Sequence, residues 1–108
     1  MAQDFERYIQ RNVGTSAVTV HTSNSDDAII SIRCANTTTS TINIDVFIND
    51  GSNDYYLIKN CPIVSGGSLE LIDGGSKIVM HNNDIFKAKS DTASSLDVWA
   101  SFVDAIST

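Results

Sequence analysis

Short segments in which apolar and polar side chains alternate recur along this chain of 108 residues, and turn residues separate them. The clearest segment runs from Ile42 to Asn49, where isoleucine or valine occupies every second position. A strand places successive side chains on opposite faces, so this period of two predicts strands with one buried face. Repetition of such segments with turns between them predicts an all-β sandwich or barrel.

About eight strands are expected. They are residues 18–21, 28–35, 42–49, 55–59, 68–71, 77–80, 85–89 and 96–103. The three consecutive strands from 28 to 59 are expected to form a meander, with a hairpin loop at 49–54. Pro62 predicts a strand end or an edge position, because proline cannot donate to a ladder. A single β-sandwich follows, and jelly-roll-like and immunoglobulin-like strand orders both fit it, since strand pairing leaves no local signature.

The start of the chain differs from this pattern. Phe5, Tyr8 and Ile9 have the i, i+3, i+4 spacing of a helix face. The sequence therefore predicts an N-terminal arm or short helix over residues 1–16, and a β-sandwich domain over 17–108. The apolar side chains of this stretch either cap one end of the sandwich or dock on a neighbouring subunit, and the sequence favours neither strongly.

Composition agrees with β structure and limits the partners. The chain has 14 serines and 9 threonines, residue types that favour strands, caps and turns over helix interiors. Its net charge of −6 disfavours a nucleic-acid surface, which needs clustered lysine and arginine. No apolar run approaches the roughly 20 residues of a membrane span, and the opening residues do not resemble a secretory signal. We expect no nucleic-acid partner, no membrane association and no export.

Residues that could perform chemistry are few. Cys34 and Cys61 are expected to be reduced thiols that behave as small apolar residues, because no export signal is present. His21 and His81 have no recognisable spacing to a nucleophile or base, and each is expected at the surface. No phosphate loop, dinucleotide fingerprint or zinc motif is present. The sequence predicts a protein that is not an enzyme and that has no cofactor.

The best metal candidate is the loop that contains Asp50, Ser52 and Asp54. Alternate oxygens around a glycine resemble the start of a calcium loop, but the bidentate acid that should follow is absent. A hairpin turn is therefore the favoured interpretation of this loop.

Three aromatic residues are candidate binding residues. Trp99 alternates with polar residues, which predicts that it lies half-buried at a rim or beneath a partner. Tyr55 and Tyr56 point to opposite sides of their strand, so they cannot both be core. Exposed aromatics on a small polar face are typical of interface anchors. The candidate partner-binding residues are Phe5, Arg7, Tyr8, Arg11, Tyr55, Tyr56 and Trp99.

Three phrases of the sequence resemble a known group of proteins. They are YIQRNVGT (8–15), VFINDGSNDYYLIKN (46–60) and SSLDV (94–98). In this order they resemble small virion structural proteins of tailed bacteriophages, especially marine and cyanobacterial ones, and the resemblance covers nearly the whole chain. It departs at residues 81–84, where HNND stands in place of an Ala-Gly-Asp-like turn. The resemblance implies a non-enzymatic component of the virion that is assembled in the host cytoplasm.

Within that class, a capsid decoration or cement protein is the leading hypothesis. Small acidic β domains gain from burying edges and aromatics against copies of themselves, so a homo-oligomer is expected, with a trimer favoured. The further partner is expected to be the major capsid protein or another virion protein. The alternative is a neck, tail or fibre module that binds host glycans through Tyr55, Tyr56 or Trp99. A bacterial carbohydrate-binding module ranks lower, because no export signal is encoded.

Overall fold

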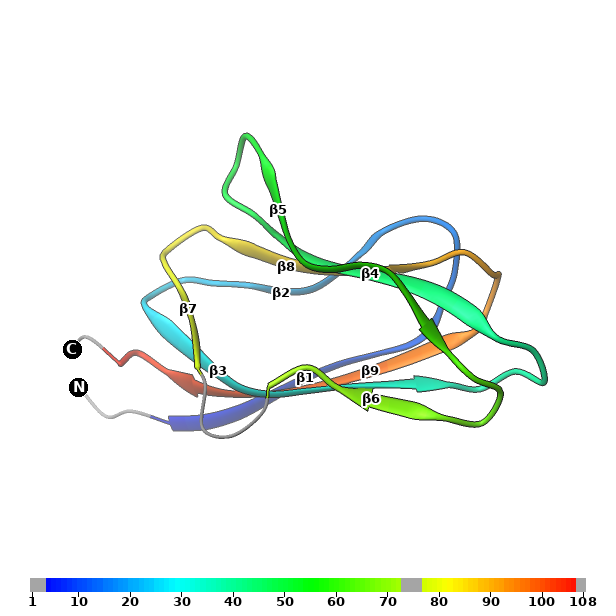
Figure 1. Ribbon diagram of the computed structural model, residues 1–108. Helices are drawn as coiled ribbons and strands as arrows, with labels where there is room; N and C mark the ends of the chain where they lie inside the picture. Colours follow the sequence, from blue (N-terminus) through cyan, green and yellow to red (C-terminus); the bar gives the residue numbers. More distant parts are fainter. Residues whose placement is uncertain (1–3, 73–76, 107–108) are drawn as a thin grey trace.

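The computed structural model describes residues 4–72 and 77–106, and within these ranges it contains strands and no helix (Figure 1). The strands are β1 (Asp4–Val13), β2 (Val18–Thr22), β3 (Asp27–Asn36), β4 (Ile42–Asn49), β5 (Asp54–Ile63), β6 (Ser68–Glu70), β7 (Ile78–Met80), β8 (Ile85–Ser90) and β9 (Leu96–Asp104). They form two antiparallel sheets that pack face to face. The β-sandwich predicted from the alternating segments is confirmed.

The strands pair as a nested hairpin. β1 pairs with β9, β2 with β8, β3 with β6 and β7, and β4 with β5. Further pairing joins β9 to β3 and β8 to β4, which gives one sheet in the order β1-β9-β3-β6, with β7 also on β3, and a second sheet in the order β2-β8-β4-β5. This nested order is that of a jelly roll. It resolves the choice between the two sandwich orders that the sequence left open.

The predicted meander of three strands is wrong, because β3 and β4 lie in opposite sheets. The link between them crosses from one sheet to the other, and the side chain of Asn36 anchors it. Asn36 Nδ2 donates to the carbonyl oxygens of Ser40 at 2.7 Å and Ile63 at 2.9 Å. The β4–β5 hairpin remains as predicted. Pro62 lies opposite Asn43 in β5, an edge strand, as its missing N–H requires.

The short helix predicted near the N-terminus is also wrong, since Asp4–Val13 forms β1 instead. Antiparallel pairing with β9 extends from Asp4 opposite Asp104 to Val13 opposite Leu96. A bulge between Gln10 and Val13 interrupts it. Pairing along a whole strand outweighs the weak local preference that the apolar spacing expressed. The stretch is thus the edge strand of the five-stranded sheet and part of the sandwich.

A bulge in β3 changes the phase of its alternation. The register with β9 shifts between Ile29 and Ser31, so Ile30 is an extra residue. Ile29 and Ile32 are both fully buried although they are three residues apart, whereas Ile30, expected to share a face with Ile32, is only partly buried. The core side chains between the sheets are Val13, Val20, Ile29, Ile32, Cys34, Ile42, Ile44, Val46, Ile63, Ile72, Met80, Phe86, Ala88, Leu96, Val98, Ala100 and Phe102.

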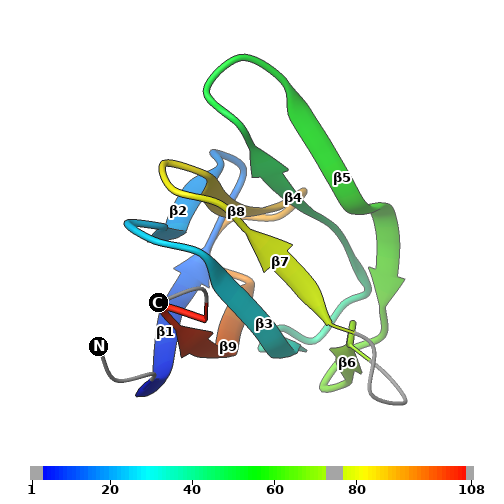
Figure 2. The same cartoon turned by 90° about the vertical axis from the view of Figure 1, so that its left-hand side faces the viewer.

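The loop end of the β4–β5 hairpin extends away from the rest of the sandwich in two perpendicular views (Figures 1 and 2). β1, β9 and β3 lie in the layer on the other side of the core. The fold therefore presents two separate surfaces on opposite sides of the core. One is the outward face of the five-stranded sheet, and the other is the projecting hairpin.

Candidate functional site

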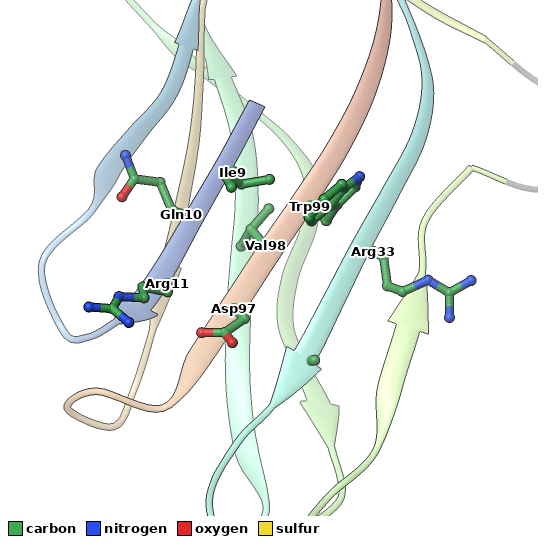
Figure 3. Close-up of a pocket in the computed structure, with 8 residues that line it drawn as sticks. Ile9, Gln10, Arg11, Arg33, Asp97, Val98 and Trp99 are labelled. Atoms are coloured by element: carbon green, nitrogen blue, oxygen red, sulfur yellow. The ribbon is translucent and has the colours of Figure 1, made fainter. Parts of the chain in front are cut away.

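The outward face of the five-stranded sheet carries a cluster of cationic and apolar side chains. The register of β1, β9 and β3 places Ile9 and Arg33 on either side of Trp99 (Figure 3). Alternate residues of β1 extend the cluster along the edge strand. Its members, which we call the Arg–Trp face, are Phe5, Arg7, Ile9, Arg11, Arg33 and Trp99. They include all three arginines of the chain.

Trp99 is the centre of this face. Its side chain is 49% exposed, and Phe5 is 81% exposed, so large apolar surface is open to a partner. The guanidinium carbon of Arg7 lies 5.0 Å from the centroid of the Trp99 ring, within the range of a cation–π contact. This contact places a positive charge beside the indole.

Two hollows flank the indole. The first, of about 430 Å³, is lined by Ile9, Gln10, Arg11, Arg33, Ala35, Asp97, Val98 and Trp99. The second, of about 410 Å³, is lined by Phe5, Glu6, Arg7, Ile30, Trp99, Ser101 and Phe102. Because Trp99 lines both, a partner side chain seated in either hollow contacts the indole and an arginine together. Aromatic and arginine side chains are those that most often dominate protein interfaces.

Two carboxylates lie on the Arg–Trp face, and both are held by backbone amides. Glu70 accepts hydrogen bonds from the amide of Ile32 and the hydroxyl of Ser31, each at 2.8 Å, and lies 3.9 Å from Arg33. Burial opposes ionisation of Glu70, but these hydrogen bonds and the arginine outweigh it and lower its pKa. Asp97 accepts from the amide of Asn12 at 3.1 Å. Three guanidinium groups therefore face two acids that already serve the fold.

The structure brings together four of the seven candidate partner-binding residues. Phe5, Arg7, Arg11 and Trp99 share the Arg–Trp face. Sequence reasoning missed Arg33, although its position between buried Ile32 and Cys34 indicates an outward side chain. It also missed the outward position of Ile9, which the helical interpretation had placed with Tyr8.

Tyr8 lies on the opposite side of β1 and faces the interior. Its ring stacks on His21 with centroids 3.7 Å apart and meets the edge of Phe102 at 5.1 Å. Burial, together with the nearby acids Asp104, Glu6 and Asp27, raises the pKa of Tyr8. Its expected role in partner binding is therefore not supported by its position.

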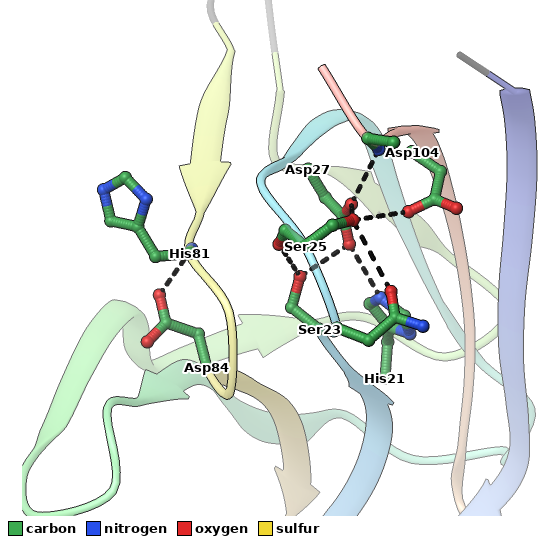
Figure 4. Close-up of polar contacts among 9 residues, drawn as sticks. His21, Ser23, Ser25, Asp27, His81, Asp84 and Asp104 are labelled. Atoms are coloured by element: carbon green, nitrogen blue, oxygen red, sulfur yellow. Dashed lines mark hydrogen bonds and ion pairs between the residues drawn. The ribbon is translucent and has the colours of Figure 1, made fainter. Parts of the chain in front are cut away.

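His21 belongs to a polar cluster at the end of the sandwich (Figure 4). Its Nε2 lies 3.0 Å from the carboxylate of Asp27, and the His21 side chain is 9% exposed, so its predicted surface position is wrong. Asp27 is buried and also accepts from the hydroxyls of Ser23 at 2.6 Å and Ser25 at 2.9 Å. His81 is exposed as predicted.

Two carboxyls of this cluster affect each other. Burial alone would raise the pKa of Asp27, but hydrogen bonds from Ser23, Asp104 and His21 outweigh it and hold the pKa below its usual range. The hydrogen bond with Asp27 raises the pKa of Asp104. Ser23 and His21 both bind Asp27 and do not form a serine–histidine relay. The cluster joins the β2–β3 turn to the end of β9, where the Ala105 amide also donates to Asp27.

The remaining two candidates, Tyr55 and Tyr56, lie on the projecting hairpin and are 56% and 43% exposed. Tyr56 packs on Phe47 with ring centroids 4.9 Å apart, and Lys59 Nζ lies 4.2 Å from its centroid. Tyr55, which lies beside the hairpin tip, is the more exposed of the two tyrosines. The tyrosines and Trp99 lie on different sheets, so they do not form one aromatic platform.

The candidate calcium loop at the tip of this hairpin is built as a turn. Asp50 Oδ1 accepts from the amides of Ser52 at 3.0 Å and Asn53 at 2.8 Å, and Gly51 has a φ of 101°. Asp54 accepts from the side chain of Asn49 at 2.7 Å. Among the described residues, no three histidine, cysteine, aspartate or glutamate side chains are grouped as a metal site would require.

The two cysteines are free thiols, as predicted. Cys34 is fully buried in the core, and burial raises its pKa to about 12. Within residues 4–72 and 77–106, no helix is long and apolar enough to cross a membrane. Comparison of the chain with protein families, with curated proteins and with solved structures finds no match.

Proposed function

We propose that this chain is a non-enzymatic structural protein of a tailed-phage virion that decorates the capsid, and that the Arg–Trp face is the surface by which it contacts the capsid shell or an adjacent copy. The observation that supports this most is the half-exposed Trp99 with all three arginines of the chain around it. A tryptophan beside arginines, with partly unfilled hollows next to it, has the composition of a protein-binding hot spot.

Assignment to a virion rests on the resemblance of the three sequence phrases to small phage proteins. The fold does not select among functions, since jelly rolls occur in viral capsid proteins and in lectins. Physical chemistry adds a constraint on how a decoration protein works. A sandwich of 108 residues that binds by its surface needs an apolar anchor and directional charge, and the Arg–Trp face supplies both.

A test uses the double variant Arg7→Glu/Trp99→Ala and a matched control, Lys89→Glu/Val64→Ala. The control also reverses one charge and truncates one exposed apolar side chain, but away from the face. Cosedimentation with heads that lack the protein should show at least about tenfold weaker binding for the face variant and little change for the control. Equal binding of both variants, or cryo-electron microscopy density on the tail and none on the head, would overturn the proposal.

A second candidate is a neck, tail or fibre module that binds host glycans, and the exposure of Tyr55 at the hairpin tip favours it. Sugar rings stack on exposed aromatic side chains in the same way as other apolar partners. Glycan-array binding that is lost in Tyr55→Ala, while that variant keeps its fold by circular dichroism, would support this function. An array without signal would exclude it for the glycans tested.

A further inference from the structure

The projecting β4–β5 hairpin has a composition complementary to that of the Arg–Trp face. Residues 49–54 contain Asp50 and Asp54 and no lysine or arginine, and the two exposed tyrosines Tyr55 and Tyr56 follow them. Hydrogen bonds from the Asn53 and Ser52 amides lower the pKa of Asp50, so its carboxylate is charged at neutral pH. The hairpin thus offers carboxylates and an aromatic ring where the face offers guanidinium groups and an indole.

The hairpin and the face of one molecule cannot meet. β4 and β5 lie in the four-stranded sheet, whereas the Arg–Trp face is the outward surface of the five-stranded sheet, with the core between them. The hairpin tip also points away from the layer that holds β1 and β9 (Figures 1 and 2). Any contact between these two surfaces must therefore join two molecules.

We propose that the Arg–Trp face receives the hairpin tip of a second copy of this chain, so that copies associate head to tail. Tyr55 of one copy seats against Trp99 of the next, and Asp54 faces the guanidinium groups of Arg7 and Arg11. Aromatic anchors commonly pair across interfaces, and paired carboxylates and guanidinium groups fix the orientation. This proposal rests on the assignment of the face as a contact surface under the proposed function, and it names the partner.

A symmetric contact of two Arg–Trp faces is disfavoured by charge. It would bring three arginines of one copy against three of the other, and two of the three acids beside the face, Glu70 and Asp97, already accept backbone amides, which leaves Glu6 as the third. The hairpin contact instead joins unlike surfaces. Such a heterologous contact closes into a ring when the rotation between copies permits it, and otherwise grows as a filament. The trimer favoured for a decoration protein would be one such ring.

The test uses one variant for each surface. The face variant is Arg7→Glu/Trp99→Ala, and the hairpin variant is Asp54→Lys/Tyr55→Ala, which keeps the hydrogen bonds of the Ser52 and Asn53 amides to Asp50. Lys89→Glu/Val64→Ala is the matched control. Light scattering with size-exclusion chromatography should show oligomers for the wild type and the control. Each single-surface variant should be monomeric at the same concentration, with association at least about tenfold weaker.

Mixing the two variants distinguishes this arrangement from others. The face variant keeps an intact hairpin and the hairpin variant keeps an intact face, so an equimolar mixture should form 1:1 dimers that do not grow further. A symmetric interface gives no such rescue, because the same damaged surface is needed twice. Rescue also demonstrates that both variants are folded, since a misfolded chain would present neither surface.

Several outcomes would overturn the hairpin proposal. They are a wild type that stays monomeric up to millimolar concentration, a hairpin variant that associates like the wild type, and a mixture of variants without dimers. The proposed function can hold even if the hairpin proposal fails. Loss of head binding in the face variant together with unchanged self-association would keep the face as the capsid contact and exclude the second copy as its occupant.

Discussion

Replacement of Asp27 by alanine should unfold this domain at a much lower temperature. Besides the Asp104 carboxyl, four groups donate to its buried carboxylate, namely Ser23 Oγ at 2.6 Å, Ser25 Oγ at 2.9 Å, His21 Nε2 at 3.0 Å and the Ala105 amide at 3.2 Å. Ser23 and Ser25 have other acceptors in the Ser25 carbonyl at 2.8 Å and Asp104 at 3.1 Å. The Ala105 amide also bonds to Asp104, so the alanine variant leaves the His21 Nε2–H without its acceptor and takes the charged acceptor from the other donors.

The expected size of the effect follows from the loss of this charged acceptor. A hydrogen bond to a charged group contributes about 1.5–3 kcal/mol, and a buried donor without a partner loses its solvation as well. We expect Asp27→Ala to lower the free energy of unfolding by about 3 kcal/mol, or the Tm by roughly 12–24 °C for a domain of this size. Asp91→Ala is the control, because Asp91 accepts the Asn43 amide at the exposed surface, where water replaces it. Its loss should stay below about 1 kcal/mol.

The same carboxylate gives the domain a dependence on pH. The pKa of Asp27 is lower in the folded chain than in the unfolded chain, so on acidification the unfolded chain binds the proton first. The stabilisation by Asp27 is complete above the unfolded pKa near 4 and is lost as the pH falls below it. Asp27→Asn should remove this acid-induced loss while keeping the shape of the side chain.

Urea titrations followed by circular dichroism at pH 7 and pH 3 measure both effects. A loss smaller than about 1 kcal/mol in Asp27→Ala would refute the reasoning on buried donors. Equal acid sensitivity in the wild type and in Asp27→Asn would refute the assignment of the titration to Asp27. The two outcomes are independent, because the first concerns hydrogen-bond acceptance and the second concerns charge.

Two further predictions concern Asp104 and the cysteines. The pKa of Asp104 is raised in the folded chain, so its contribution to stability is greatest below the unfolded pKa and is lost as the pH rises through the folded pKa. In Asp104→Asn the amide N–H can donate to Asp27 at any pH, so this variant should raise the Tm at pH 7 by roughly 2–4 °C in calorimetry. A lower Tm would contradict the attribution of the raised pKa to the hydrogen bond with Asp27. Cys34, with its pKa raised to about 12 and its side chain in the core, should react with thiol reagents more than about 100-fold slower than Cys61 in the native protein and equally fast in urea. Equal native rates would show that the core opens near β3.

The parts of the fold that the sequence predicted well are those with a clear contrast between two faces. Residues 42–49 form β4 with the predicted bounds, because isoleucine or valine meets the core at every second position. β1 lacks this contrast. Phe5 and Ile9 point outward and Tyr8 points inward, so apolar side chains lie on both faces and their spacing imitates a helix.

The strand order could not be predicted, because it depends on pairs that are distant in the sequence. β1 and β9 pair from Asp4 with Asp104 to Val13 with Leu96, and no local feature of either strand specifies the other. The Arg–Trp face depends on that same pairing, since Arg7, Arg33 and Trp99 come from three strands. Sequence reasoning could identify its aromatic and arginine members singly, while their assembly required the fold.

The sequence contains a pattern that indicates the largely enclosed position of His21. Ser23, Ser25 and Asp27 alternate directly after it, and each can accept or donate within a tight turn. A histidine followed by such a set has nearby partners that compensate for burial, so it need not stay at the surface. Polar residues that alternate across a turn therefore indicate hydrogen-bond partners for an enclosed side chain, as apolar residues that alternate along a strand indicate a buried face.

The nested pairing also explains why this small domain can present two complementary surfaces. The outermost pair, β1 with β9, and the innermost pair, β4 with β5, occupy opposite sheets. Surfaces built on them face different directions, so one molecule can give its hairpin to one neighbour while its face receives the hairpin of another. If the rotation between neighbours produces a closed ring, the solution mass reaches a fixed multiple of the monomer mass and stays there as the concentration rises. If no ring closes, the mass continues to grow. The concentration dependence of the mass therefore reports the geometry of the contact as well as its strength.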